Sequence, residues 1–163
     1  IDKSSENTPE IPAEELINLL PHKGKMFLLD HLTQHDTVAR TLESESLVTK
    51  NHIFYDEALD GIPSHVAFEL IAQSISALSG VTGCERGEPA KPGFLLSLQN
   101  YQAHAASFKA GTSVHCVIKK IDELENMMTY SGVAYSSEDP EKPVVETVIT
   151  VMETTDLRVL GEN

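Results

Sequence analysis

The most strongly patterned segment of the chain is the apolar-rich stretch Val66–Val81. Its hydrophobic residues occupy nearly every face of a helix instead of one stripe, which is typical of a helix that is buried on most sides. Ser64 stands where a residue can cap the start of such a helix, and Gly80 and Gly83 stand where glycine commonly ends one. The pattern therefore predicts one long buried helix that begins at Ser64 and ends at about Gly80.

After this helix the pattern changes to short runs that are rich in strand-forming residues. The four runs are Phe94–His104, Thr112–Ile121, Met127–Tyr135 and Val144–Glu153. Turn-forming residues lie between them. Consecutive strands with short links predict an antiparallel meander of four strands.

The part of the chain before the long helix predicts a shorter helix, two strands and a loop. Pro12 stands at a position typical of a first helical turn, and Pro21 ends the apolar pattern that follows it. Met26–Leu29 and Val38–Thr49 are rich in strand-forming residues. Asn51–Pro63 shows no sustained period and is expected to be an ordered loop.

One apolar helix and a long antiparallel meander have one economical arrangement, in which a curled sheet wraps the helix and buries it on most sides. The sequence thus predicts an α+β hotdog fold in a single domain over residues 13–156, with a flexible N-terminal segment (1–12) and a C-terminal tail (157–163). Such a sheet leaves an edge strand, and edge strands are commonly paired between two copies. We therefore expect a homodimer or a higher homo-oligomer, with a heterodimer as the alternative.

Composition narrows the possible partners and the compartment. The 163 residues include 25 acidic and 12 basic side chains, for a formal net charge of −13, which disfavours nucleic acid and anionic membrane surfaces as partners. No run of about 18 apolar residues occurs, so no membrane span is predicted. Two cysteines, Cys84 and Cys116, form neither a disulfide framework nor a metal-binding spacing. Since no signal-peptide pattern is visible either, we expect a cytoplasmic protein.

Glu69 is the most informative residue, because it is a carboxylate in the first turns of an otherwise apolar helix. Burial disfavours the ionised form of a carboxylate, so we expect the pKa of Glu69 to be raised. A carboxylic acid that is partly protonated near neutrality is suited to general-acid catalysis. Gln73 lies one turn further along and can hydrogen-bond Glu69 or a ligand. In the alternative, Glu69 faces a solvent-filled gap or pairs with a buried cation.

The start of the same helix offers a second chemical feature. The first backbone N–H groups of a helix have no partner within it, and their partial positive charge attracts anions. Pro63 and Ser64 put such groups five or six residues before Glu69. A thioester carbonyl bound there would be polarised as negative charge develops on its oxygen. An acid and an oxyanion site on one helix suit chemistry at the carbons alpha and beta to a carbonyl.

This chemistry also needs a base, and the chain has seven histidines. None of them shows the spacing of a metal-binding motif, so no metal is expected. His52 precedes the helix in the loop, and His65 lies one turn before Glu69. These two histidines are the candidates for the base.

Three segments resemble motifs of the bacterial 3-hydroxyacyl-[acyl-carrier-protein] dehydratases. Residues 19–30 contain Leu-Leu-Pro-His-Lys and Met-Phe-Leu-Leu-Asp, similar to the family opening "LLPHR-yPFLLvDr". Residues 62–73 resemble the helix motif "MPGVLIVEAMAQ" and keep its spacing of six between Pro63 and Glu69. Residues 108–112 are similar to the "V-x-PGD" turn that follows the helix.

The similarity covers roughly residues 13–154 in order, and the best fit is a branch associated with aryl-polyene pigment synthesis. In that branch the loop and helix read "HPLL…G-x-PAW-x-G-x-E-x-MAQ-x-x-A". The matching residues here are His52, Ile53, Phe54, Gly61, Pro63, Ser64, Glu69, Ala72, Gln73 and Ala77.

The resemblance implies removal of water from a 3-hydroxyacyl thioester, carried by acyl carrier protein or coenzyme A, to give the trans-2-enoyl thioester. In the family a histidine takes the C2 proton, a carboxylic acid protonates the departing hydroxyl, and a backbone N–H polarises the carbonyl. By position these roles fall to His52, Glu69 and Ser64, with Gln73 and His65 as further substrate-binding residues. In the family the histidine and the acid come from opposite subunits, so the resemblance implies a dimer with an apolar tunnel for the acyl chain at its interface and no need for a metal or organic cofactor.

The sequence departs from the family at the histidine. The family's Gly-His-Phe-Pro is replaced by Asn51–Phe54, and the loop that follows is longer, which keeps His65 open as an alternative base. A hotdog thioesterase, or a non-catalytic subunit of a heteromeric dehydratase, stays an alternative function. Docking of an acidic carrier protein would need a local basic patch, for which Lys23, Lys25 and Lys109 are candidates.

Overall fold

The structure, a computed structural model, describes residues 11–12, 28–87 and 93–153. The elements are β1 (Ile11–Pro12), β2 (His31–Asp36), β3 (Thr41–Leu47), β4 (Gly61–Pro63), α2 (Val66–Arg86), β5 (Gly93–Ala103), β6 (Ser107–Lys109), β7 (Ser113–Leu124), β8 (Met127–Ser136) and β9 (Asp139–Glu153). Seven strands form one sheet in the order β1-β2-β3-β7-β8-β9-β5, and β4 pairs with β6 in a second sheet of two strands. All of these pairs are antiparallel.

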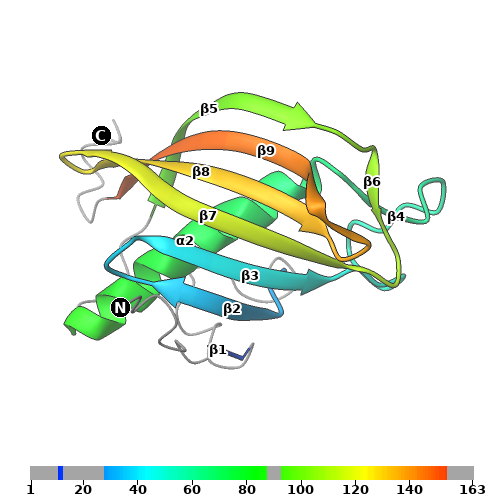
Figure 1. Cartoon of the computed structure of the whole chain (residues 1–163), viewed down its shortest axis with the longest axis horizontal. Helices are drawn as coiled ribbons and strands as arrows, with labels where there is room; N and C mark the ends of the chain where they lie inside the picture. Colours follow the sequence, from blue (N-terminus) through cyan, green and yellow to red (C-terminus); the bar gives the residue numbers. More distant parts are fainter. Residues whose placement is uncertain (1–10, 13–27, 88–92, 154–163) are drawn as a thin grey trace, which may run out of the picture.

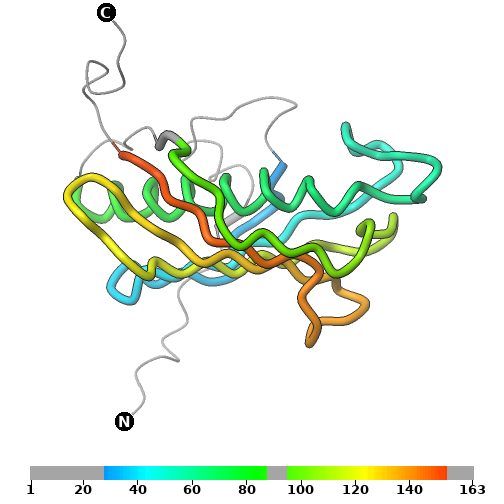
Figure 2. Tube along the Cα trace, turned by 90° about the horizontal axis from the view of Figure 1, so that it is seen from above, coloured from blue at the N-terminus to red at the C-terminus, as the bar shows by residue number. Residues whose placement is uncertain are grey.

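The long helix α2 lies along one face of the large sheet and packs on β3, β7 and β8 (Figures 1 and 2). Its side chains Leu70, Ile71 and Leu78 are at most 1% exposed. The helix is long and apolar enough to cross a membrane, but 72% of its apolar window is buried inside the protein, as in a core helix. The predicted α+β arrangement of one long buried helix against a curled antiparallel sheet is therefore confirmed.

The predicted four-strand meander is correct for three strands and wrong for the first. β7, β8 and β9 follow one another in the sheet, whereas β5 lies beyond β9 at the outer edge (Figure 1). After β5 the chain forms β6, which pairs with β4, and only then enters β7 beside β3. The short link between β5 and β7 therefore does not make these strands neighbours. One edge of β7 pairs with β8, and the other edge is occupied by β3.

The limits of the long helix also differ from the prediction. The residue before its first turn is His65, which makes no side-chain capping bond, so Ser64 is not the cap. The helix continues through both Gly80 and Gly83 and ends at Arg86, where it is followed by the capping residue Gly87, whose φ of 68° is left-handed. Glycine inside a helix costs only about 1 kcal/mol, and packing against the sheet outweighs this because residues 80–83 are buried.

The first part of the chain differs most from the prediction. Pro12 pairs with His31 in β1 and does not open a helix, while residues 13–27, which contain most of the predicted short helix, lie outside the described residues. The predicted strand at residues 26–29 is not a strand at Leu28 and Leu29, although both are buried. The next predicted strand begins later, at Thr41, because residues 37–40 form a turn. Residues 61–63 of the predicted loop form β4.

Gly61 allows the loop before the helix to lie against β6. A Cβ atom at this position would be 1.9 Å from the backbone oxygen of Phe108, which a side-chain movement cannot relieve. Gly61→Ala is therefore expected to lower the free energy of unfolding by about 1–3 kcal/mol or more in urea denaturation. Gly87→Ala is the comparison: it meets no neighbour within 4 Å, so only its left-handed backbone, about 1–2 kcal/mol, opposes it. A smaller loss in Gly61→Ala than in Gly87→Ala would contradict this assignment.

Candidate active site

Glu69 lies in the first turn of α2, close to the point where the small sheet holds the start of the helix. β4 leads into this helix start and is fixed by its ladder with β6, in which Pro63 pairs with Ser107. The Glu69 side chain is half-buried and lines a hollow beside the helix. The fold thus presents one carboxylate at a defined place on an otherwise apolar helix.

Gln73 orients this carboxylate. Its side chain is 0% exposed, and its Oε1 atom accepts a hydrogen bond from the backbone N–H of Leu28 at 2.9 Å. This leaves the amide nitrogen to donate to Oε1 of Glu69 at 3.1 Å. Of the two roles predicted for Gln73, the structure therefore contains the hydrogen bond to Glu69. The buried amide links the carboxylate to the main chain just before β2.

A groove runs from Glu69 along α2, between the helix and strands β5 and β9. The residues that give it apolar walls are Phe68, Ala72, Ile75, Leu95, Ile149 and Val151. The helical ones recur every three or four residues and so share one side of the helix. The groove has a volume of about 210 Å³. A carboxylate at one end and apolar walls along its length suit an acyl chain whose reactive end lies at Glu69.

The expectation that the Ser64 N–H is free at the helix start needs a correction. This group donates to the carbonyl oxygen of Ala106 at 2.9 Å, as a continuation of the β4–β6 ladder. The N–H groups of Ala67 and Phe68 donate to the carbonyls of Ser64 and His65. The N–H groups of His65 and Val66 are the ones at this helix start that have no hydrogen-bond partner in the described part of the chain. An oxygen bound here would therefore meet the amide of His65 before that of Ser64.

His52 lies in the loop before β4, half-buried, with its ring centroid 6.0 Å from that of Phe54. Its Nδ1 atom accepts a hydrogen bond from the backbone N–H of Phe54 at 3.1 Å. A neutral imidazole carries one proton, so this hydrogen bond places that proton on Nε2. Burial lowers the pKa of His52 below its ordinary value, and the charge of Asp30 partly opposes this shift. At neutral pH His52 is therefore an uncharged ring that presents an N–H group.

His65, the other candidate base, is exposed and directly precedes α2. Within the described part of a single chain, no hydrogen bond joins His52 or His65 to Glu69. The described residues of one protomer thus join Glu69 to Gln73 by a hydrogen bond, but they join neither His52 nor His65 to this pair in that way. Across the described residues, no group of three or more histidine, cysteine or acidic side chains is placed to hold a metal ion.

Comparison with known proteins assigns the chain to a family. The model of the ApeP-like dehydratases, described as ApeP dehydratase, matches residues 14–162. The chain belongs to the ApeP-like dehydratase family. The resemblance to dehydratases that the sequence motifs indicated is therefore confirmed. Comparison with curated proteins gives no match.

Solved structures resemble this dehydratase-family chain in fold. The dehydratase heterocomplex ApeI:P from Xenorhabdus doucetiae matches at 18% identity with a TM-score of 0.78, over 90% of this chain and 95% of that chain. A hypothetical thioesterase with coenzyme A from Streptococcus pneumoniae matches at 10% identity and a TM-score of 0.58, over 76% of this chain and 84% of that one. The Escherichia coli PaaI protein of the phenylacetic acid degradation operon matches at 9% identity and 0.57, over 74% and 80%. These likenesses confirm the hotdog fold.

The apolar strand residues of the groove were not among the predicted site residues of this ApeP-like chain. Ile149 and Val151 lie two residues apart, so the alternation of side chains along a strand could have indicated that they share a face. No local signal indicates Leu95, because its place in the groove depends on β5 lying next to β9.

Proposed function

We propose that this chain catalyses the dehydration of a 3-hydroxyacyl thioester to the trans-2-enoyl thioester, in fatty-acid-like or polyene-type synthesis in the cytoplasm. The observation that carries the proposal is the Glu69 carboxylate, held by the buried Gln73 at one end of an apolar groove. Membership of a dehydratase family supports the reaction class. The apolar walls support an acyl chain as the part of the substrate that gives affinity.

In this proposal Glu69 acts as the general acid. A base removes the proton from C2, the C2–C3 double bond forms, and the C3–O bond breaks with its electrons going to oxygen. Protonated Glu69 gives its proton to the departing hydroxyl, which leaves as water, and the base later returns its proton to Glu69 through solvent. The Gln73 amide aims the carboxyl group at the substrate, and the N–H of His65 stabilises the charge that develops on the thioester oxygen.

His52 is the proposed base, and its ring must change partner to serve as one. The lone pair of its Nδ1 atom is taken by the N–H of Phe54, whereas a base has to present an unprotonated nitrogen to the C2 proton. Catalytic hydrogen bonds commonly rearrange only when substrate is bound. We therefore propose that substrate binding frees this nitrogen. His65 is the alternative base if it does not.

The pH dependence of the reaction tests the role of His52. Activity that needs neutral His52 is expected to fall only as the pH drops through its lowered pKa. Asp30→Asn removes a charge that raises this pKa, so the acid limb of kcat/KM should move to lower pH. Asp139→Asn, at the exposed start of β9, is the matched control and should leave the limb in place. An unmoved limb in Asp30→Asn would exclude His52 as the base.

Pairing of two chains through β5 completes the proposal. β5 is the outermost strand of the sheet, and Leu95, Leu96 and Leu98 on it are 42–51% exposed. An edge strand with exposed leucines favours association with another strand. Dimerisation along β5 would set the groove of one subunit beside its partner, so that histidine and acid come from different subunits.

The carrier of the acyl group is proposed to be an acyl carrier protein or coenzyme A. Of the three lysines predicted to dock an acidic carrier, Lys109 lies in the described residues, where its Nζ donates to the carbonyl of Leu59 at 2.6 Å. Lys23 and Lys25 lie outside the described residues. Lys109 lies beside β4, the strand that leads into the start of the helix, since it pairs with Gly61. That position favours contact with a carrier near the reactive end of the groove.

The reaction can be tested directly with a 3-hydroxyacyl pantetheine thioester. The proposed function predicts a rise in enoyl-thioester absorbance without release of free thiol. Release of thiol without enoyl product would instead indicate a thioesterase. The same assay run in reverse, from the enoyl thioester, should show hydration, because an enzyme accelerates both directions.

A second candidate function is a subunit that needs a different partner for its base. Two observations favour it: the Nδ1 atom of His52 is occupied by Phe54, and the ApeI:P structure is named as a heterocomplex. In that case the purified chain is expected to bind the thioester but not to turn it over, and a partner with a free histidine should restore activity. Turnover by the purified chain alone would exclude it.

A further inference from the structure

A β-bulge changes the path of β5 close to its end. The register with β9 shifts between Gln99 and Gln102, so that Asn100 and Tyr101 together lie opposite the single residue Thr147. Asn100 takes a left-handed φ of 54°, and the hydroxyl of Thr147 donates to the carbonyl of Gln99 at 3.1 Å. A bulge re-aims a side chain and is frequent beside active sites. The side chain that this bulge re-aims is that of Tyr101.

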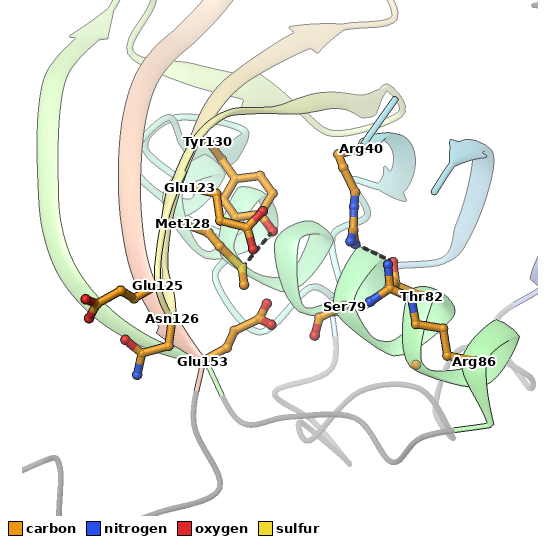
Figure 3. A pocket seen from close by; sticks show the side chains of 11 residues that line it. Arg40, Ser79, Thr82, Arg86, Glu123, Glu125, Asn126, Met128, Tyr130 and Glu153 are labelled. Atoms are coloured by element: carbon orange, nitrogen blue, oxygen red, sulfur yellow. Dashed lines mark hydrogen bonds between the residues drawn. The ribbon is translucent and has the colours of Figure 1, made fainter. Parts of the chain in front are cut away.

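The hydroxyl group of Tyr101 differs in its surroundings from that of Tyr130. The Tyr101 ring is partly buried and packs against the core, and its oxygen atom is buried without a hydrogen-bond partner in the described part of the chain. The hydroxyl of Tyr130, at the far end of α2, contacts the sulfur of Met128 at 3.8 Å (Figure 3). A buried polar group without a partner costs free energy. Such a group calls for an explanation, of which a role in catalysis is one.

Tyr101 lies toward the reactive end of the groove. Ser79 of α2 and Glu153 of β9 line a common hollow at the far end of the helix (Figure 3). From there α2 runs back to Glu69, while β9 runs back through the groove wall to Thr147, next to Tyr101. The end of β5 lies on the same side of the molecule as β6 and the start of α2 (Figure 1). The strand wall of the groove therefore leads toward Tyr101, as its helical wall leads to Glu69.

The link between β5 and β6 fixes the end of β5 relative to the helix start. The N–H of His104 donates to the carbonyl of Val144 on β9 at 2.7 Å. The carbonyl of Ala106 then accepts the N–H of Ser64 at 2.9 Å, directly before the helix. Tyr101 on the strand side and the amide of His65 on the helix side are thus held by one set of backbone hydrogen bonds. Two donors on such a rigid frame suit a single oxygen atom between them.

Tyr101 is a neutral donor near neutral pH. Burial raises the pKa of Tyr101 above its ordinary value, so the phenol keeps its proton. In the proposed reaction the departing hydroxyl has to receive a proton, which Glu69 supplies. The thioester oxygen instead needs donors that keep their protons while negative charge develops on it. A buried phenol suits the second of these oxygens.

We propose that the hydroxyl of Tyr101 donates a hydrogen bond to the thioester oxygen of the substrate, as the strand-side partner of the His65 amide. The inference rests on the proposed function, in which the thioester lies at the Glu69 end of the groove. Tyr101 is partly exposed, so a rotation of its ring can bring the hydroxyl to the substrate. Rotamer changes of this kind are common on binding. The hydroxyl breaks no hydrogen bond of the described chain when it moves.

Tyr101→Phe tests this role in steady-state kinetics with a 3-hydroxyacyl pantetheine thioester. Removal of one donor to a developing oxyanion commonly lowers kcat by about 10²–10³-fold, and we expect a loss of about 10²-fold with little change in KM. The acid limb of kcat/KM should stay in place, because Tyr101 transfers no proton. A variant within about threefold of the unchanged kcat would overturn the proposal. A displaced acid limb would overturn the role of a donor that keeps its proton.

Stability separates this role from a structural one. Phenylalanine keeps the ring and removes only a hydroxyl without a partner in the described chain, so Tyr101→Phe should unfold in urea at the unchanged free energy or a higher one. Tyr135→Phe is the matched control. A Cβ at Gly132 would meet Ile71 of α2, and by strand alternation Tyr135 faces away from the helix, so kcat should be unchanged. A lowered unfolding free energy in Tyr101→Phe would show that its hydroxyl serves the fold and would overturn the proposal.

Two unreactive analogues separate failure of this inference from failure of the proposed function. In one a methylene group replaces the sulfur, which leaves a ketone oxygen, and the other is a thioether without that oxygen. Tyr101→Phe should weaken binding of the ketone by about 3- to 10-fold, the effect of one hydrogen bond, and leave binding of the thioether unchanged.

Each combination of results has one meaning. If the unchanged protein dehydrates no thioester but only its ketone binding depends on Tyr101, the proposed function fails and the oxygen site stands. If the thioester is dehydrated equally by both proteins and the ketone binds equally, the proposed function stands and the oxygen site is excluded. Equal weakening of ketone and thioether would also exclude it, because the thioether has no oxygen at this position.

Discussion

Glu69→Gln is expected to lower kcat for dehydration by about 10²–10⁴-fold, with little change in KM. A carboxamide has nearly the size of the carboxyl group but cannot transfer a proton to the departing hydroxyl. General-acid catalysis commonly contributes a factor of this size. Because the side chain is only half-buried and lines the groove, the substitution should leave folding and thioester binding largely unchanged. The measurement is steady-state kinetics with the 3-hydroxyacyl thioester, together with circular dichroism of both proteins.

Glu85→Gln is the matched control for this experiment. Glu85 lies on the same helix, at its exposed last turn, where it accepts a hydrogen bond from Thr37 at 2.6 Å. The same change of carboxylate to carboxamide there should leave kcat unchanged, since it is remote from the groove's reactive end. A Glu69→Gln protein that dehydrates within about threefold of the unchanged rate would exclude Glu69 as the acid.

Gln73→Leu is expected to lower both stability and activity. Leucine fills a similar volume, but the backbone N–H of Leu28 would lose its acceptor, and a buried donor without a partner costs about 1–3 kcal/mol. Glu69 would also lose the donor that holds its Oε1 atom. Loss of alignment at a reacting group commonly reduces kcat by about 10- to 100-fold. Urea denaturation and single-turnover kinetics measure the two effects separately.

Ser74→Ala separates the loss of a buried hydrogen bond from the loss of alignment. Ser74 is as buried as Gln73 and lies next to it, but its hydroxyl bonds Ser44 on β3 at 2.7 Å and the carbonyl of Leu70. Removing it should reduce the free energy of unfolding while kcat stays at the unchanged value. Equal loss of kcat in both variants would mean that Gln73 acts through stability alone.

Local patterns predicted the elements of this fold better than their arrangement. The apolar residues on nearly every face of the helix around Leu70 and Leu78 predicted that it is buried, and strand-forming runs predicted β5, β7, β8 and β9. The predicted end of the helix was wrong, because tertiary packing around Gly80 outweighs the low helix propensity of glycine. The predicted position of β5 was wrong as well, since the edge of β7 where it was expected is occupied by β3.

The candidate site, too, could be predicted from the sequence only in part. Glu69 and Gln73 are one helical turn apart, so sequence spacing alone predicted that they could interact, and the structure contains that hydrogen bond. The hydrogen bond of the Ser64 amide to Ala106 could not be predicted, because it needs the pairing of β4 with β6. The tautomer of His52 depends in turn on the fold of one loop around Phe54. The catalytic roles of Ser64 and His52 stay predictions.

The strand β5 takes part in two features of the molecule. Its residue Leu95 lines the groove, and the strand itself is an edge of the sheet. Any polypeptide that pairs with this edge strand would therefore contact the wall that we propose for the acyl chain. The identity of the protein partner and the preference for one substrate over another would then not be independent properties of the molecule. On the proposed function, exchanging one partner for another would change the chain-length preference without a single mutation in this polypeptide.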